Sequence, residues 1–124
     1  MTDSNTALNF LFVFNKAPHS TPSTKEGLDA LLTASAFGQN VTLLLLGDGV
    51  FQAIKSQDPS GLPTKNTAAI FQSLDMYGVE SIVTLDKSLQ ERGLTLDDIS
   101  IPCSTLTPKE VKELYSTQHK IFTF

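Results

Sequence analysis

The sequence contains few of the residues from which metal, disulfide and cofactor sites are usually built. Among its 124 residues are one cysteine, two histidines and no tryptophan. A single cysteine excludes an internal disulfide and a cysteine-based zinc site. The two histidines, His19 and His119, are far apart, and neither has further ligands around it at metal-binding spacing. The composition therefore predicts no metal and no cofactor.

Positive charge is also scarce. Nine Lys and Arg residues stand against 13 Asp and Glu residues, a formal net charge of −4. A protein that binds nucleic acid by itself needs a basic surface to displace counterions, so this chain is not expected to bind nucleic acid directly. No apolar run reaches the roughly 18 residues of a membrane span, and residues 1–6 lack the basic start of a secretory signal. We expect no membrane association and a cytoplasmic location.

Charged residues of both signs make up 18% of the chain, against roughly 25% in an average soluble protein. A chain of this length with 40% apolar residues can bury a core without disulfides. Because few charges remain to cover the surface, we expect part of it to contact a partner.

Apolar runs alternate with helical patterns along the chain. Predicted strands cover residues 8–14, 41–46, 79–85, 98–102 and 119–124. Predicted helices cover residues 25–37, 64–77 and 107–116, with shorter segments at 50–55 and 89–94. This alternation is typical of an α/β fold with a mainly parallel sheet. We predict a single doubly wound, three-layer domain over residues 1–124, with residues 1–6 flexible and five strands in the order 2-1-3-4-5.

Ligands of such sheets bind at the carboxyl ends of the strands, where the loops 15–23, 47–49 and 86–88 are expected. The first loop has two prolines and no glycine, whereas a flavin-phosphate loop needs backbone N–H donors, so flavin is not expected. The second loop lacks a dinucleotide-binding pattern. Its glycines predict a tight turn in which Asp48 caps the next helix. The alternative is a partner contact that includes an exposed Phe51.

Two residues remain as candidates for chemistry. Cys103 is expected at the carboxyl end of the fourth strand, where it could carry a persulfide if a nearby helix or cation lowered its pKa. The alternative for a lone cysteine is a small buried apolar side chain. His19 could act as a general base, but no nucleophile is linked to it by the sequence. His119 is interpreted as structural.

Several short motifs nevertheless point to a known family. They are Ala17-Pro18-His19, Lys25-Glu26-Gly27-Leu28-Asp29-Ala30-Leu31-Leu32, Gly47-Asp48-Gly49-Val50-Phe51-Gln52 and Ser88-Leu89-Gln90-Glu91-Arg92-Gly93-Leu94. In this order and at this spacing the chain resembles the DsrE/DsrF-like family of sulfur-relay proteins, and within it the C-type (DsrF-type) subunits. The resemblance covers nearly the whole chain.

The resemblance implies a role that the residues alone do not supply. Such subunits assemble with B and D subunits into a heterohexamer that passes persulfide sulfur toward 2-thiolation of the wobble uridine in tRNA. In sulfur-oxidising bacteria the related complex serves sulfur oxidation instead. The relay cysteine of the D subunit lies after the third strand, but here residues 83–88 contain no thiol. Leu85 stands where C-type relatives can carry a cysteine.

This departure implies a non-catalytic subunit that supports the partner carrying the thiol. We expect the partner contact at the second loop and its neighbours, that is at His19, Gly47, Asp48, Gly49 and Phe51. Persulfide carriage on Cys103 remains the alternative.

Overall fold

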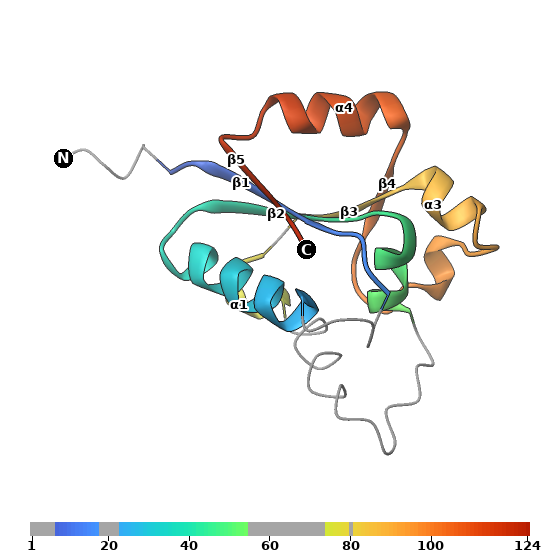
Figure 1. Cartoon of the computed structure of the whole chain (residues 1–124), viewed down its shortest axis with the longest axis horizontal. Helices are drawn as coiled ribbons and strands as arrows, with labels where there is room; N and C mark the ends of the chain where they lie inside the picture. The colour runs from blue at the N-terminus through green and yellow to red at the C-terminus, as the bar shows by residue number, and fades with distance from the viewer. Residues whose placement is uncertain (1–6, 18–22, 55–73, 80) are drawn as a thin grey trace, which may run out of the picture.

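The fold is built on a five-stranded, all-parallel sheet. The computed structural model describes residues 7–17, 23–54, 74–79 and 81–124. The strands are β1 (Asn9–Phe14), β2 (Asn40–Leu45), β3 (Ser81–Leu85), β4 (Ser104–Leu106) and β5 (Lys120–Thr123), in the order β4-β3-β2-β1-β5 (Figure 1). Every neighbouring pair is parallel. The predicted α/β class is confirmed.

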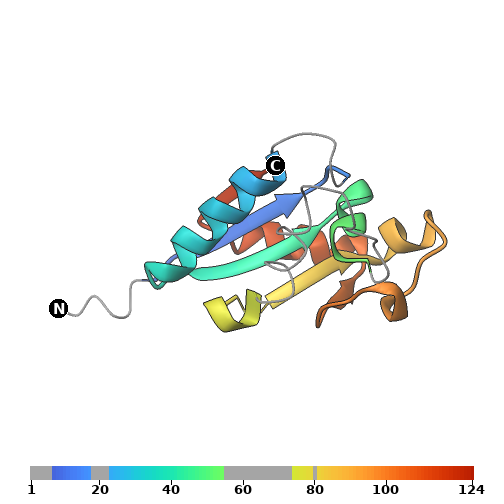
Figure 2. The same cartoon turned by 90° about the horizontal axis from the view of Figure 1, so that it is seen from below.

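Helices cover both faces of this sheet, as a three-layer fold requires. Helix α1 (Ser23–Ala36) lies below the sheet in Figure 1, and α4 (Pro108–Ser116) lies above it. Seen from below, α1 runs along β1 and β2 (Figure 2). The shorter helical segments are η2 (Gly47–Ala53), η3 (Leu74–Tyr77), α3 (Asp86–Gln90) and η4 (Leu96–Asp98). None of the helices in the described part of the chain is long and apolar enough to cross a membrane.

The predicted strand order, 2-1-3-4-5, is wrong. In the structure β2 separates β1 from β3, and β5 returns to the free side of β1. Both orders use parallel strands with crossover connections, so the handedness rule alone does not separate them. The order depends on which face each connecting helix covers, because α4 crosses the face opposite α1 and carries the chain back to β1. The sequence does not state which face a helix will choose.

The fourth strand also lies later than predicted. Residues 98–102 are not a strand, because η4 ends at Asp98 and β4 begins only at Ser104. Ile99 and Ile101 are 5% and 6% exposed and belong to the main core. The apolar alternation therefore reports burial of two side chains, and Ile99 pairs with Ile54 only in an isolated antiparallel bridge outside the sheet. Of the predicted helix 64–77, residues 64–73 lie outside the described residues, and its described end is the 3-10 helix η3.

Local sequence signals explain the two long helices. Gly38, with a φ of +82°, follows the end of α1 as predicted, since glycine adopts this left-handed conformation without steric cost. At the start of α4, the Thr107 hydroxyl accepts from the Glu110 N–H at 3.2 Å, and the Glu110 carboxylate accepts from the Thr107 N–H at 2.9 Å. Pro108 occupies the first helical turn, as predicted from the sequence.

The two faces of the sheet bury unequal cores. On the α1 face, Phe12, Phe14, Leu43 and Leu45 pack with Leu28 and Leu31 of the helix in a large cluster. On the α4 face, a small cluster of Leu11, Val13 and Leu44 packs against half-buried Val111, Leu114 and Tyr115. Because β1 and β2 carry apolar side chains on both faces, they read as continuous apolar runs in the sequence.

Candidate functional site at the carboxyl edge of the sheet

The carboxyl edge is shaped first by a close backbone contact at Gly49. Helix η2 starts two residues after β2, and the Leu46 N–H donates to the Phe14 carbonyl at 3.0 Å. A Cβ atom on Gly49 would overlap the Phe14 carbonyl oxygen. Only glycine therefore lets η2 pack directly against the end of β1.

Ser88 ties η2 to the segment that follows β3. Its hydroxyl oxygen accepts from the Gly47 N–H at 2.9 Å, and the residue is 3% exposed. Gly47 has a φ of +52°, which favours glycine. The glycines of the 47–49 loop thus make the tight turn predicted from the sequence. The predicted cap by Asp48 is wrong, because Leu46 holds the N-cap position and no side chain caps η2.

Asp48 instead pairs with Arg92. Its Oδ1 lies 3.0 Å from Nη2 and 3.1 Å from Nε of Arg92, and Arg92 Nη1 donates to the Ser88 carbonyl at 3.1 Å. A second carboxylate, Glu91, lies 3.6 Å from Nη1. Sequence reasoning did not single out Arg92 as a site residue. No signal in the sequence could have paired it with Asp48, because the two residues are distant in the chain and meet only through the sheet.

The loop after β1 is held by the same turn. Gln52, 5% exposed, donates from Nε2 to the Lys16 carbonyl at 3.0 Å. Phe51 is half-buried against the main core, whereas the alternative interpretation of this loop has it exposed. His19 lies outside the described residues.

The third loop of this edge contains Leu85, the last residue of β3, followed at once by α3. The neighbouring Thr84 is fully buried, and its hydroxyl donates to the Leu45 carbonyl at 2.8 Å. Asp86 Oδ1 is buried without a hydrogen-bond partner among the described residues.

Cys103 does not lie at this edge. It precedes β4 rather than following the fourth strand, so the predicted position at a strand's carboxyl end is wrong. The side chain is half-buried against the main core, and its Sγ lies 3.6 Å from the Ser104 carbonyl oxygen. Burial raises the pKa of the Cys103 thiol to about 11 because desolvation penalises the thiolate.

The other histidine joins two strands. His119 Nδ1 accepts from the Asn9 N–H at 2.8 Å, and the His119 N–H donates to the Asn9 carbonyl at 2.8 Å. These bonds fix the segment before β5 against the start of β1, which is the structural role predicted for His119. Within the described ranges, no three His, Cys, Asp or Glu side chains gather where they could hold a metal ion.

Several polar side chains that the structure describes at the carboxyl edge are engaged within the chain. Ser88 has its oxygen engaged by Gly47, and Arg92 has its guanidinium engaged by Asp48 and a carbonyl. A nucleophile activated by a base needs a thiol, hydroxyl or amine within hydrogen-bond reach of that base. No such pair is formed by the residues described at this edge.

Comparison with known proteins assigns the fold to a family. The sequence profile of the DsrE/DsrF-like family matches residues 9–124. The chain belongs to this family.

Its sequence relatives narrow the class further. A protein named Protein TusC homolog from Vibrio parahaemolyticus is 36% identical over 113 residues, which is 91% of this chain and 96% of that protein. A protein of the same name from Aliivibrio fischeri is 34% identical over the same shares of both chains. The similarity therefore spans almost the full length of each relative.

Solved structures share the fold at lower identity. The ychN protein from E. coli has a TM-score of 0.76 at 19% identity and matches 94% of this chain and 99% of its own. The protein MTH1491 from Methanobacterium thermoautotrophicum has a TM-score of 0.66 at 14% identity, with 93% and 98% matched. At such identities the likeness supports the fold alone.

Proposed function

We propose that this chain is a non-catalytic subunit of a heterohexameric sulfur-relay complex, in which B and D subunits are its partners. In this complex, persulfide sulfur moves toward 2-thiolation of the wobble uridine in tRNA, and the present chain supports the subunit that carries the relay thiol. The complex is proposed to act in the cytoplasm. The chain contributes to it as a single domain over its whole length.

The relatives support the type of subunit. Similarity to the TusC homologs covers 91% of this chain, so a whole domain rather than a shared motif is compared. The C-type resemblance read from the motifs agrees with these names.

The position of the thiol supports the non-catalytic role, and this is the observation that carries the proposal. Cys103 is the sole thiol of the sequence. It lies at the start of β4, and its pKa is raised to about 11 by burial, whereas a persulfide carrier needs an accessible thiolate. At the end of β3, Leu85 offers a hydrocarbon side chain, which cannot form a persulfide.

The turn at the start of η2 is proposed as one partner contact, together with His19. Asp48 has 56% of its side chain exposed and is held in place by Arg92, so it presents a fixed carboxylate. Gly49 is buried and Phe51 is half-buried, so these two shape the turn while Gly47 and Asp48 meet the partner.

The test is co-expression with the B and D subunits of the same organism, followed by native mass measurement and intact-mass detection of persulfide on each chain. We expect a stoichiometric complex in which the mass of an added sulfur atom appears on a partner. The Cys103→Ser variant is expected to preserve both assembly and sulfur transfer.

Two other outcomes would refute parts of the proposal. Added sulfur on this chain that disappears in Cys103→Ser would make the chain a persulfide carrier. The complex would be assigned to sulfur oxidation if it assembles, but deletion of its genes leaves tRNA thiolation intact and stops growth on reduced sulfur compounds.

A further inference from the structure

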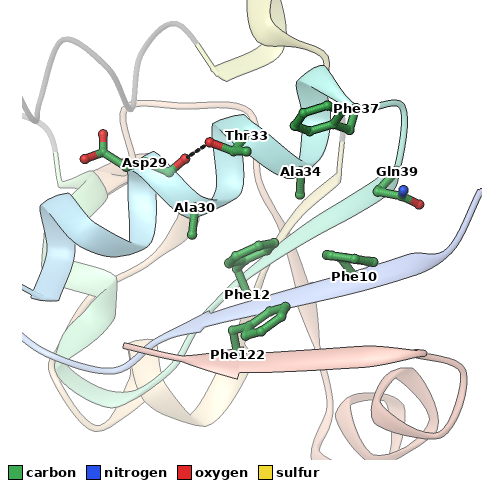
Figure 3. Close-up of a pocket in the computed structure, with 9 residues that line it drawn as sticks. All are labelled: Phe10, Phe12, Asp29, Ala30, Thr33, Ala34, Phe37, Gln39 and Phe122. Atoms are coloured by element: carbon green, nitrogen blue, oxygen red, sulfur yellow. Dashed lines mark hydrogen bonds between the residues drawn. The ribbon is translucent and has the colours of Figure 1, made fainter.

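A groove lies between α1 and the β1–β5 edge of the sheet, away from the carboxyl edge. It has a volume of about 500 Å³. Figure 3 shows that the rings of Phe10, Phe12 and Phe122 form its floor, and that Ala30 and Ala34 of α1 face this floor. The rings are in mutual contact, with Phe12 and Phe122 centroids 5.2 Å apart.

We propose that this groove receives a helix of a partner subunit in the sulfur-relay complex, with an apolar face on the aromatic floor and a basic side chain beside Asp29. The proposal rests on the proposed function and names the surface and the chemistry of one partner contact. It is distinct from the contact at η2, which lies at another part of the molecule.

The layer architecture favours a helix as the occupant. In an α/β fold each face of the sheet is covered by helices packed side by side. Helix α1 covers β1 and β2, whereas no helix among the described residues covers β5 on the α1 face. The small side chains of Ala30 and Ala34 let a second helix approach α1 closely. A strand added to the edge of β5 would extend the sheet but leave the aromatic floor open.

Exposed aromatic surface around the groove supports a protein partner. Phe37, at the end of α1, is 77% exposed, and Phe122 is 39% exposed. With about 200 Å² for each aromatic side chain, these two leave roughly 230 Å² in water. That is more than a quarter of the about 800 Å² that one side of a stable interface buries.

Charge identifies which helix would fit. Asp29 is the one ionisable residue among those that line the groove, and Glu26, one turn earlier on α1, is also exposed. The Thr33 hydroxyl donates to the Asp29 backbone carbonyl at 2.7 Å and leaves its carboxylate free to face solvent. No cation of the described part of the chain lies within ion-pair distance of either carboxylate. A Lys or Arg on the partner helix would complement this acidic end.

The steric test places a long charged side chain in the groove. Ala30→Arg changes an exposed position that lines it, and Ala36→Arg changes an exposed alanine of the same helix that does not. Each variant is co-expressed with the B and D subunits, and complex formation is measured by native mass and titration. We expect Ala30→Arg to weaken assembly at least tenfold and Ala36→Arg to assemble as the wild type does. Unchanged thermal unfolding of both isolated variants shows that the fold is intact.

The charge test reverses Asp29. Asp29→Lys is expected to weaken assembly at low salt and to lose part of this effect at high salt, because repulsion between exposed charges is screened. The control is Asp97→Lys, which makes the same change on the exposed surface of η4 and should leave assembly unaltered.

The outcomes separate the two proposals. A wild-type chain that does not assemble with B and D subunits refutes the proposed function and, with it, the occupant of the groove. If the wild-type chain and the Ala30→Arg variant assemble equally well, only the proposal about the groove is refuted. If the isolated wild type forms a dimer that Ala30→Arg dissociates, the occupant is a second copy of this chain and the inference is wrong.

Discussion

The carboxyl edge of the sheet and the groove beside β5 differ in how far their side chains are covered by the rest of the chain. Among the residues described at the carboxyl edge, Gly49 packs against the Phe14 carbonyl and Ser88 binds the Gly47 N–H. In the groove, Phe122 is 39% exposed and Phe37 is 77% exposed, while Phe12 beneath them belongs to the buried core.

This difference bears on the role of the subunit. Parallel α/β sheets usually bind ligands at the carboxyl edge, because the loops there leave a crevice. Here the guanidinium of Arg92 links the turn η2, through Asp48, to the Ser88 carbonyl of α3. The exposed Phe37 and Phe122 lie instead beside a groove suited to another protein, which is what an assembly subunit requires.

The largest loss of stability at the carboxyl edge is expected from Gly49→Ala. Its Cβ would overlap the Phe14 carbonyl and crowd Asn15 Cα, and these backbone atoms leave little room to relax. We expect a loss of about 3–5 kcal/mol in the free energy of unfolding, measured by urea denaturation. The control is Gly93→Ala. Gly93 has a φ of +67°, but an added Cβ would meet no heavy atom beyond its chain neighbours within 4 Å. Only the cost of the left-handed backbone, about 1–2 kcal/mol, therefore applies. Equal losses for the two variants would show that the close contact is not needed.

A smaller effect is expected from Ser88→Ala. The variant leaves the Gly47 N–H without its acceptor in a site that is nearly inaccessible to water. Such an unsatisfied donor costs about 1–2 kcal/mol in the free energy of unfolding. Ser104→Ala, at an exposed strand position, serves as the matched control in the same chemical denaturation experiment. A loss no larger than that of the control would contradict the link between η2 and α3.

The ion pair at the edge contributes less. Arg92→Met removes the contacts to Asp48 and to the Ser88 carbonyl, but 56% of the Asp48 side chain is exposed. We expect a loss of about 0.5–1 kcal/mol that decreases with added salt. A double-mutant cycle with Asp48→Asn isolates the pair, and a coupling energy near zero would mean that Arg92 acts only through the carbonyl.

A change in the groove should affect assembly rather than the free energy of unfolding. Phe37→Ser removes a side chain that is mostly in water, so we expect a stability change within about 0.5 kcal/mol by thermal unfolding. The same variant is expected to weaken assembly with the partner subunits. A variant that loses stability but assembles normally would remove Phe37 from the interface and narrow the contact to the aromatic floor.

The smallest effect at neutral pH concerns Cys103. Its pKa of about 11 in the fold exceeds the 9.0 of a free thiol, so the folded state holds the proton more tightly. The stability contributed by this protonated thiol is present below pH 9 and is lost as pH rises from 9 toward 11. Denaturation at pH 8 and pH 10, compared with Cys103→Ala, measures this difference. If the free energy of unfolding changes between pH 8 and pH 10 by the same amount in the wild type and in Cys103→Ala, the thiol is not desolvated.

Parts of the carboxyl edge could be predicted from the sequence. The glycines of the 47–49 loop indicated a tight turn after a buried strand, and the structure has that turn at the start of η2. The role assigned to Asp48 was wrong because a cap is a local feature, whereas its actual partner, Arg92, comes from a segment that only the fold brings near.

The position of Cys103 was predicted wrongly for a related reason. Ile99 and Ile101 alternate as in a strand, but they fill the core while β4 starts later, at Ser104. Alternation records which side chains are buried, and burial has more than one backbone solution.

The sequence by itself determined the α/β class, the ends of α1 and α4 and the family, because these depend on local periodicity, capping residues and short motifs. Only the tertiary structure decided the strand order, the pairing of Asp48 with Arg92 and the open groove beside β5. Each of these depends on which face of the sheet a helix covers. That choice comes from packing among residues distant in the chain, which no local pattern specifies.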